Sequence, residues 1–145
     1  MKHAMIFVNL PVADLAASRA FFEALGYTFD ERFSDENAAG LILGDTQVAM
    51  LLRRDFYQTF VPDKQVADAR SASEVLVCLS AESRDEVDAL ADGAVAAGAS
   101  VGRTEDHGFM YGRSFDDLDG HTWEIMWMDP AAVEAGPEAY AAGQS

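Results

Sequence analysis

The strongest constraint on the fold is a pattern of apolar runs and glycine stops that occurs twice along the chain. Each copy has a β-rich run, an apolar stripe at helical spacing that stops at a glycine, and three more β-rich runs. The first copy predicts strands at residues 4–10, 27–33, 38–43 and 46–53, with a helix that ends at Gly26. The second predicts strands at residues 74–81, 100–104, 109–115 and 121–128, with a helix that ends at Gly98. The chain is therefore a degenerate duplication of one βαβββ module.

The duplication predicts an α+β fold in which two βαβββ modules form a partly closed curved sheet with the helices outside. Asp14 is placed to cap the first helix, and Ser83 with Glu86 forms a capping box for the second. We expect one domain over residues 1–130, with module one at 1–60, a connector at 54–73 and module two at 74–130. Residues 131–145 are an Ala-rich tail whose composition fits a short helix or disorder. The concave inner face of such a sheet is free for a ligand.

Charge and cysteine content exclude several classes of partner and site. Ten Lys and Arg against 25 Asp and Glu give a formal charge of -15, which repels nucleic acid and anionic membranes. No apolar run approaches the roughly 20 residues of a membrane helix, and the start of the chain lacks signal-peptide features. Cys78 is the only cysteine, so an intrachain disulfide and a multi-cysteine metal site are impossible. We expect a cytoplasmic protein.

Alternation in the last strand points one carboxylate towards the inner face. Trp123, Ile125 and Trp127 share one face, which we expect to pack on a helix. Glu124 and Met126 then point into the cleft. Because a carboxylate in an apolar cleft must be paired, hydrated or protonated, Glu124 is the candidate catalytic residue.

Several short motifs resemble the vicinal oxygen chelate superfamily, which includes glyoxalase I, bleomycin resistance proteins and extradiol dioxygenases. These motifs are Val12–Leu15 with Ser18, Phe21-Phe22, Leu25-Gly26, Phe115–Gly120 and Trp123–Ile125. The resemblance spans residues 4–129. It implies the paired βαβββ fold, a small-molecule or metal site in the cleft, and a homodimer.

The resemblance also implies metal ligands, typically His, Gln or Glu, on the first and last strand of each module. Those positions hold Phe7, Met50, Leu76 (or its neighbour Val75) and Glu124. Three of the four cannot ligate the Zn, Ni, Mn or Fe of such enzymes, so we expect no cofactor and no metal ligands. A displaced metal site built from Asn9, Glu74 and Glu124 is the alternative.

The predicted cleft lining is apolar and soft, which suits a flat or aromatic small molecule. The candidate substrate-binding residues are Phe7, Asn9, Met50, Leu52, Leu76, Tyr111, Arg113 and Met126. The same apolar side chains can instead fill an ordinary core.

Cys78 is expected to be a small buried hydrophobe, and His3, His107 and His121 are expected to be solvated. His107 is also a candidate gate or general base.

The partner of Glu124 depends on the hairpin that precedes it. A two-residue turn at Leu118-Asp119 places Arg113 opposite Glu124, whereas a shift of one residue places Ser114 there. An Arg113–Glu124 pair serves either to neutralise the carboxylate or to bind a ligand.

Three functions are compatible with these residues. We favour a metal-free small-molecule-binding protein, either a sequestering or resistance-type binder or an enzyme with atypical catalysis. The second is a divalent-metal lyase or isomerase of the glyoxalase I type, or an extradiol dioxygenase, with Glu124 as a ligand. The third is a regulatory module that uses the tail at residues 131–145.

Overall fold

The computed structural model describes residues 1–144, which form two compact units divided between Ser73 and Glu74. We call them unit 1 and unit 2 and describe each by itself. Within the described residues, no helix combines the length and the hydropathy that crossing a bilayer requires.

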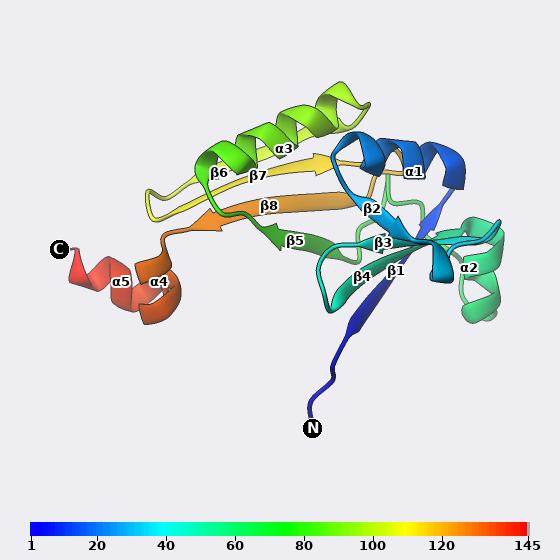
Figure 1. Ribbon diagram of the computed structural model, residues 1–145, viewed down its shortest axis with the longest axis horizontal. Helices are drawn as coiled ribbons and strands as arrows, with labels where there is room; N and C mark the ends of the chain where they lie inside the picture. The colour runs from blue at the N-terminus through cyan, green and yellow to red at the C-terminus, as the bar shows by residue number, and fades with distance from the viewer. Residues whose placement is uncertain (145) are drawn as a thin grey trace. The chain divides into compact units, whose positions relative to one another are not determined.

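Unit 1 is a four-stranded sheet, called sheet A, with two helices in contact with it (Figure 1). Its elements are β1 (Ile6–Val12), α1 (Leu15–Ala24), β2 (Thr28–Asp30), a 3-10 turn (Glu31–Phe33), β3 (Ala38–Ile42), β4 (Gln47–Arg53) and α2 (Arg54–Phe60). The strand order is β1-β4-β3-β2, with β1 parallel to β4 and the other pairs antiparallel. This is the predicted βαβββ order.

Helix α1 begins and ends where its sequence signals predict. The Asp14 carboxylate accepts a hydrogen bond from the Ala17 N–H at 3.0 Å, and Gly26 adopts a φ of 93° just beyond the end of the helix. Phe21 and Phe22 are 3% and 2% exposed, so the apolar stripe of α1 forms the core of unit 1.

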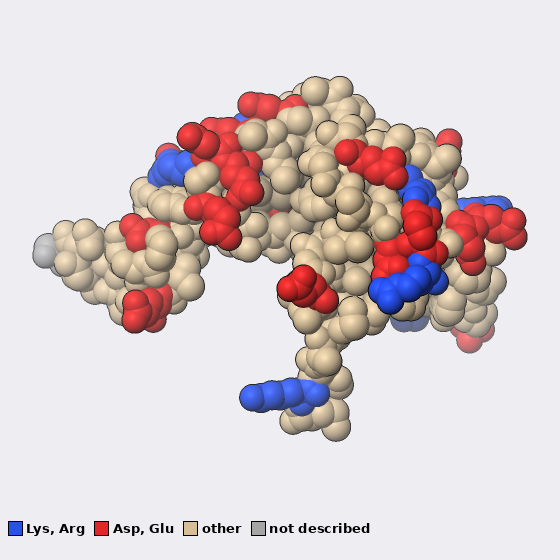
Figure 2. Space-filling model, in the orientation of Figure 1, with Lys and Arg blue, Asp and Glu red and all other residues tan. Residues whose placement is uncertain are grey.

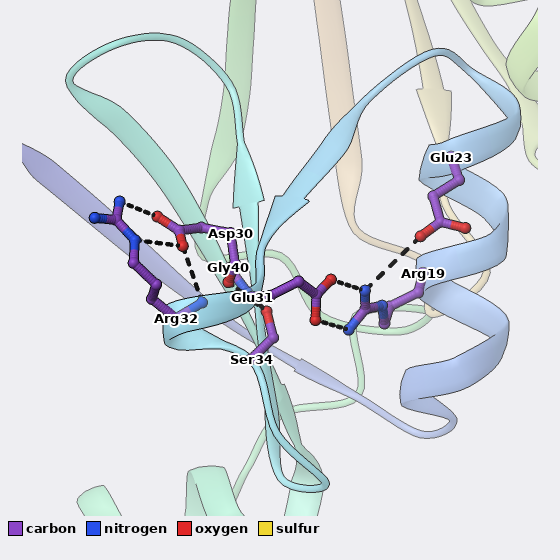
Figure 3. Close-up of polar contacts among 7 residues, drawn as sticks. All are labelled: Arg19, Glu23, Asp30, Glu31, Arg32, Ser34 and Gly40. Atoms are coloured by element: carbon purple, nitrogen blue, oxygen red, sulfur yellow. Dashed lines mark hydrogen bonds and ion pairs between the residues drawn. The ribbon is translucent and has the colours of Figure 1, made fainter.

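The predicted strand at 27–33 is wrong over its second half, because the chain turns at Asp30. The Asp30 carboxylate accepts hydrogen bonds from the Arg32 N–H and guanidinium, and the Ser34 hydroxyl donates to the Asp30 carbonyl (Figure 3). The Gly40 N–H donates to the Ser34 hydroxyl oxygen at 3.2 Å. These side-chain bonds replace ladder bonds, so the strand stops after three residues.

Unit 2 repeats the same topology in sheet B. Its elements are β5 (Leu76–Ser80), α3 (Arg84–Ala96), β6 (Ser100–Asp106), β7 (Met110–Asp116), β8 (Thr122–Met128), α4 (Pro130–Ala135) and α5 (Pro137–Gly143). The strand order is β5-β8-β7-β6, and β5 is parallel to β8. Half of the predicted capping box forms, since the Glu86 N–H donates to the Ser83 hydroxyl oxygen. The Glu86 carboxylate accepts from the N–H of Glu82, the residue before the N-cap, instead of the Ser83 N–H. Helix α3 lies along one face of sheet B (Figure 1).

The tail is helical rather than disordered over its described residues. Ala132 in α4 is fully buried, and the Tyr140 ring in α5 lies 5.8 Å from the Phe109 ring, centroid to centroid. The Tyr140 hydroxyl donates to the Asp129 carboxylate at 3.2 Å. These contacts attach the two short helices to the end of the β7–β8 hairpin.

The turn between β7 and β8 has three residues rather than two, which settles the register of the hairpin. The Asp117 N–H donates to the His121 carbonyl at 2.9 Å, and Gly120 adopts a φ of 90°. The register pairs Ser114 with Glu124 and Arg113 with Ile125. The predicted Arg113–Glu124 pairing is therefore wrong, and the one-residue alternative is confirmed.

The physical reason for the longer turn is the Asp117 carboxylate, which is 8% exposed. It accepts hydrogen bonds from the Asp119 N–H at 2.9 Å, the His121 N–H at 3.0 Å and the Trp123 indole N–H at 2.9 Å. A buried carboxylate needs such donors, and this turn supplies all three.

We predict that Asp117→Ala lowers the free energy of unfolding by about 2–3 kcal/mol, because three donors around a buried site lose their acceptor. Urea unfolding followed by tryptophan fluorescence measures the change. The matched control is Asp45→Ala, which removes an exposed turn carboxylate of unit 1 and should stay within about 0.5 kcal/mol of the parent. Equal effects of the two substitutions would show that Asp117 does not hold the turn.

Candidate functional site

The candidate residues of unit 1 share one face of sheet A. The parallel register of β1 and β4 pairs Asn9 with Met50 and places Phe7 and Leu52 on the same side. The opposite face carries the fully buried residues Leu41 and Leu51 and packs on α1. Phe7 is 43% exposed, whereas Leu52 is 4% exposed. Part of this face is therefore core, and Phe7 is its accessible aromatic residue.

Phe33 is a neighbour of Phe7 that sequence analysis placed in a strand. The 3-10 turn sets its ring 6.4 Å from the Phe7 ring, edge to face. A Cβ on Gly40 would lie 3.3 Å from the Phe33 Cβ, so the turn packs closely over this glycine. A glycine inside an apolar strand, such as Gly40, indicates that another segment approaches the strand closely, so this contact could have been predicted from the sequence.

The candidate residues of unit 2 fall on both faces of sheet B. Glu124 lies in β8 with Cys78 beside it in β5 and Ser114 opposite in β7, and Leu76 and Met126 share this face. We call it the Glu124 face. Trp123 on the other face is fully buried, as the alternation in β8 predicts, together with Val87 of α3.

Tyr111 and Arg113 lie on the helix side of sheet B, so their predicted place beside Glu124 is wrong. The Tyr111 hydroxyl donates to the Asp88 carboxylate at 2.6 Å, and Arg113 donates to the same carboxylate at 3.0 Å. Arg113 also forms an ion pair with Asp92 at 2.9 Å. The three-residue turn moves every β7 side chain to the face opposite the one predicted from a two-residue turn. The hydrogen bonds from Tyr111 and Arg113 lower the pKa of Asp88.

A small depression lies over the Glu124 face. It is lined by Arg103, Glu105, Met110, Gly112, Arg113, Ser114, Glu124, Ile125 and Met126. Sequence analysis identified Arg113, Glu124 and Met126 among these, raised Ser114 as an alternative, and missed Arg103 and Glu105.

Arg103 and Glu105 reach the depression because β6 is irregular. The register of β6 against β7 shifts between Val101 and Thr104, and the Arg103 N–H donates to the Ser114 hydroxyl oxygen at 2.8 Å. A Cβ on Gly102 would lie 2.6 Å from the Ser114 carbonyl oxygen, so only glycine fits there. The Arg103 guanidinium forms an ion pair with Glu105.

The Glu124 carboxylate has no partner within residues 74–144. It is half-buried, and no hydrogen bond or ion pair reaches it from the described part of unit 2. The expected neutralisation by Arg113 does not occur, because that guanidinium is held by Asp88 and Asp92 on the other face.

Cys78 is exposed, so the expectation of a buried cysteine is wrong. Partial desolvation and then the neighbouring Glu124 charge raise the pKa of its thiol. The thiol is therefore protonated at neutral pH and is a poor nucleophile.

The histidines do not gather around Glu124. The His107 side chain is 54% exposed in the β6–β7 hairpin, with its Nε2 atom 4.0 Å from the Glu105 carboxylate. His3 is exposed, and the His121 main chain belongs to the β7–β8 turn. Within residues 1–144, no group of three or more His, Cys, Asp or Glu side chains is placed to hold a metal ion.

The ion pairs of Arg113 join α3 to β7. The pKa of Asp88 is lower in the folded state than in the unfolded state. Its charge therefore stabilises the fold at any pH above the unfolded-state pKa, and this stabilisation is lost as the pH falls through the folded-state pKa. Arg113→Met should lower the thermal midpoint by several degrees at pH 7, and the difference should shrink below about pH 4. Thermal unfolding across pH tests this.

The control for Arg113 is Arg103→Met, which breaks a pair whose arginine side chain is 73% exposed and should change the midpoint little. A pH-independent loss in Arg113→Met would contradict the assignment of the effect to the Asp88 charge.

The reactivity of the Cys78 thiol depends on the β5–β8 register, which places Glu124 beside it. Glu124→Gln removes the negative charge beside the thiol, lowers the thiol pKa and should increase the rate of alkylation by iodoacetamide at pH 8 about threefold. Glu82→Gln, which removes an exposed carboxylate of the same unit, should leave the rate unchanged. An unchanged rate in Glu124→Gln would show that the two side chains are not neighbours.

Comparisons with known proteins agree with the topology described above. The sequence model of the family described as bleomycin resistance protein-like N-terminal matches residues 5–44. No curated protein matches the chain.

Several solved structures share the fold. A hypothetical protein from S. aureus is 26% identical, with 88% of this chain and 94% of that one covered and a TM-score of 0.72. A glyoxalase-related enzyme from Fulvimarina pelagi is 23% identical, with 88% of each chain covered and a TM-score of 0.73. A glyoxalase/bleomycin resistance protein/dioxygenase family enzyme from Burkholderia phytofirmans PsJN is 18% identical, with 84% and 96% covered and a TM-score of 0.72. The chain therefore has the fold of solved structures described as glyoxalase/bleomycin resistance protein/dioxygenase family proteins, with two βαβββ modules, and its residues 5–44 resemble the bleomycin resistance protein-like family.

Proposed function

We propose that this protein binds a small organic molecule on the Glu124 face of sheet B without a divalent metal, as a binder of the sequestering or resistance type. The observation that carries the proposal is the half-buried Glu124 carboxylate, which lines the depression and has no partner within residues 74–144. No polar group in the described part of unit 2 satisfies this carboxylate, and a bound molecule would give it a partner.

The lining of the depression supports a small-molecule ligand. Met110, Met126 and Gly112 provide a soft apolar surface, and Ser114 and Glu124 provide polar groups on the same face. Ligand sites commonly combine a mostly apolar wall with a few polar groups that orient the molecule. Thioethers adapt to flat ligands and make favourable contacts with aromatic rings.

The donor atoms at the family's ligand positions do not fit a divalent metal. Phe7 offers a ring, Met50 a thioether and Leu76 an aliphatic chain, and Glu124 alone offers a hard donor. This donor set supports binding without a metal, and no step of the proposed function depends on one.

The chemistry around Glu124 favours binding over covalent catalysis. Nucleophilic catalysis requires an activated nucleophile next to a base, and the Cys78 thiol has a raised pKa.

The superfamily resemblance supports a homodimer, and a single cysteine suits the reducing cytoplasm, so we include both in the proposal.

Metal analysis of tag-free protein tests the proposal against the competing function, a metal-dependent lyase or extradiol dioxygenase with Glu124 as a ligand. We expect far less than one Zn, Ni, Mn or Fe per chain by mass spectrometry and no thermal shift with any of the four ions. About one ion per chain that is lost in Glu124→Gln would establish the competing function instead.

A thermal-shift screen of aromatic small molecules tests the binding itself. A ligand at a hundred times its Kd should stabilise the protein by about 2.7 kcal/mol, which is a shift of several degrees. We expect Glu124→Gln to reduce the shift. Glu82→Gln is the control for a change in net charge alone.

A further inference from the structure

We propose that the depression around Glu124 selects organic cations, that is, molecules with a protonated amine attached to an aromatic or aliphatic body. The inference rests on the proposed function, because it names the class of molecule that binds on the Glu124 face.

The state of the Glu124 carboxylate limits which molecules can cover it. Glu124 is half-buried between Cys78 on β5 and Ser114 on β7, and no donor from residues 74–144 reaches it. A ligand that covers this carboxylate removes its water, which is costly unless the ligand supplies donors or positive charge. A protonated amine supplies both, whereas a second carboxylate would add repulsion.

The arginines of unit 2 have other partners. Arg84 donates to the Asp106 carboxylate and to the Gly108 carbonyl, and its guanidinium lies over the Tyr111 and Trp127 rings. Arg113 is held by carboxylates on the helix side of the sheet. Arg103 and Arg113 are both among the lining residues of the depression, but the Arg103 guanidinium is paired with Glu105 and the Arg113 guanidinium with Asp88 and Asp92.

The field around the site is negative. Residues 74–145 contain three arginines, no lysine and 15 Asp and Glu, so this half of the chain holds a formal charge of -12 out of the total of -15. Figure 2 shows acidic side chains in several places on the visible face, with basic side chains next to some of them. Such a field concentrates cations near the surface and repels anions. The charge of the whole unit and the single carboxylate therefore favour the same class of ligand.

The surface next to Glu124 limits the body of the ligand. Met110 and Met126 lie on the Glu124 face, and Gly112, two residues after Met110 in β7, pairs with Met126. A Cβ on Gly112 would lie 3.4 Å from the Ile125 carbonyl oxygen. The missing side chain at Gly112 leaves the backbone accessible next to two thioethers. A flat ring can lie against this surface while its amine reaches Glu124.

Three probes of the same shape and different charge test the inference: 2-naphthylmethylamine, 2-naphthylmethanol and 2-naphthoate. Titrations of the full chain, followed by NMR chemical shifts at pH 7, give a Kd for each. We expect the amine to bind about ten- to a hundredfold more tightly than the alcohol, because a charge-assisted hydrogen bond replaces a neutral one, and the carboxylate to bind most weakly.

Variants then assign the preference to one side chain. Glu124→Gln should remove the preference for the amine and leave the alcohol within about threefold of its original Kd, and Glu82→Gln should preserve the preference. High salt should weaken binding of the amine more than binding of the alcohol, a measurement that needs no variant.

Equal binding of amine and alcohol, or tighter binding of the naphthoate, would overturn the inference and leave the proposed function standing. A preference for the amine that persists in Glu124→Gln would also overturn it, because the charge would then lie elsewhere. No binding of any of the three probes would contradict the proposed function itself.

Discussion

The buried Asp117 carboxylate determines how the two faces of sheet B are used. It accepts three hydrogen bonds inside one turn, from two backbone N–H groups and the Trp123 indole, and thereby holds a three-residue connection between β7 and β8. Successive side chains of a strand alternate between faces, so a turn one residue shorter would exchange every β7 side chain between the helix side and the open side. The environment of Glu124 is a consequence of that turn.

The helix side of unit 2 takes up the polar groups that would otherwise neutralise Glu124. Arg113 and Tyr111 meet Asp88 of α3, and Arg84 joins the start of the same helix to Asp106 at the end of β6. These pairs are partly exposed, so each contributes modestly and mainly orients the helix on the sheet. They also keep the Arg113 guanidinium away from Glu124, whose β7 neighbour in the register is Ser114.

The two modules share a topology and have diverged in chemistry. On sheet A the face with Asn9 and Met50 is largely apolar, and its accessible side chains include Asn9 and the Phe7 and Phe33 rings. On sheet B the corresponding face has a carboxylate, two thioethers and an irregular edge strand that brings Arg103 and Glu105 to the rim. Most of the negative charge of the chain lies in the second module. The duplication therefore supplies one scaffold twice, and the second copy carries the carboxylate on which the proposed site is built.

Local interactions made much of this protein predictable from its sequence. Helix caps at Asp14 and Ser83, the glycines that end both helices and the alternation around Trp123 all act between residues a few positions apart, so the βαβββ order and the direction of Glu124 follow from the sequence. The shortened β2 and the partners of Arg113 could not be predicted in this way. They depend on which side chains accept hydrogen bonds from the backbone once the strands pair. The Asp30 and Asp117 carboxylates accept such bonds and turn the backbone where a strand or a shorter hairpin was predicted. Sequence periodicity thus determined which residues alternate, whereas tertiary hydrogen bonding decided which of them face each other.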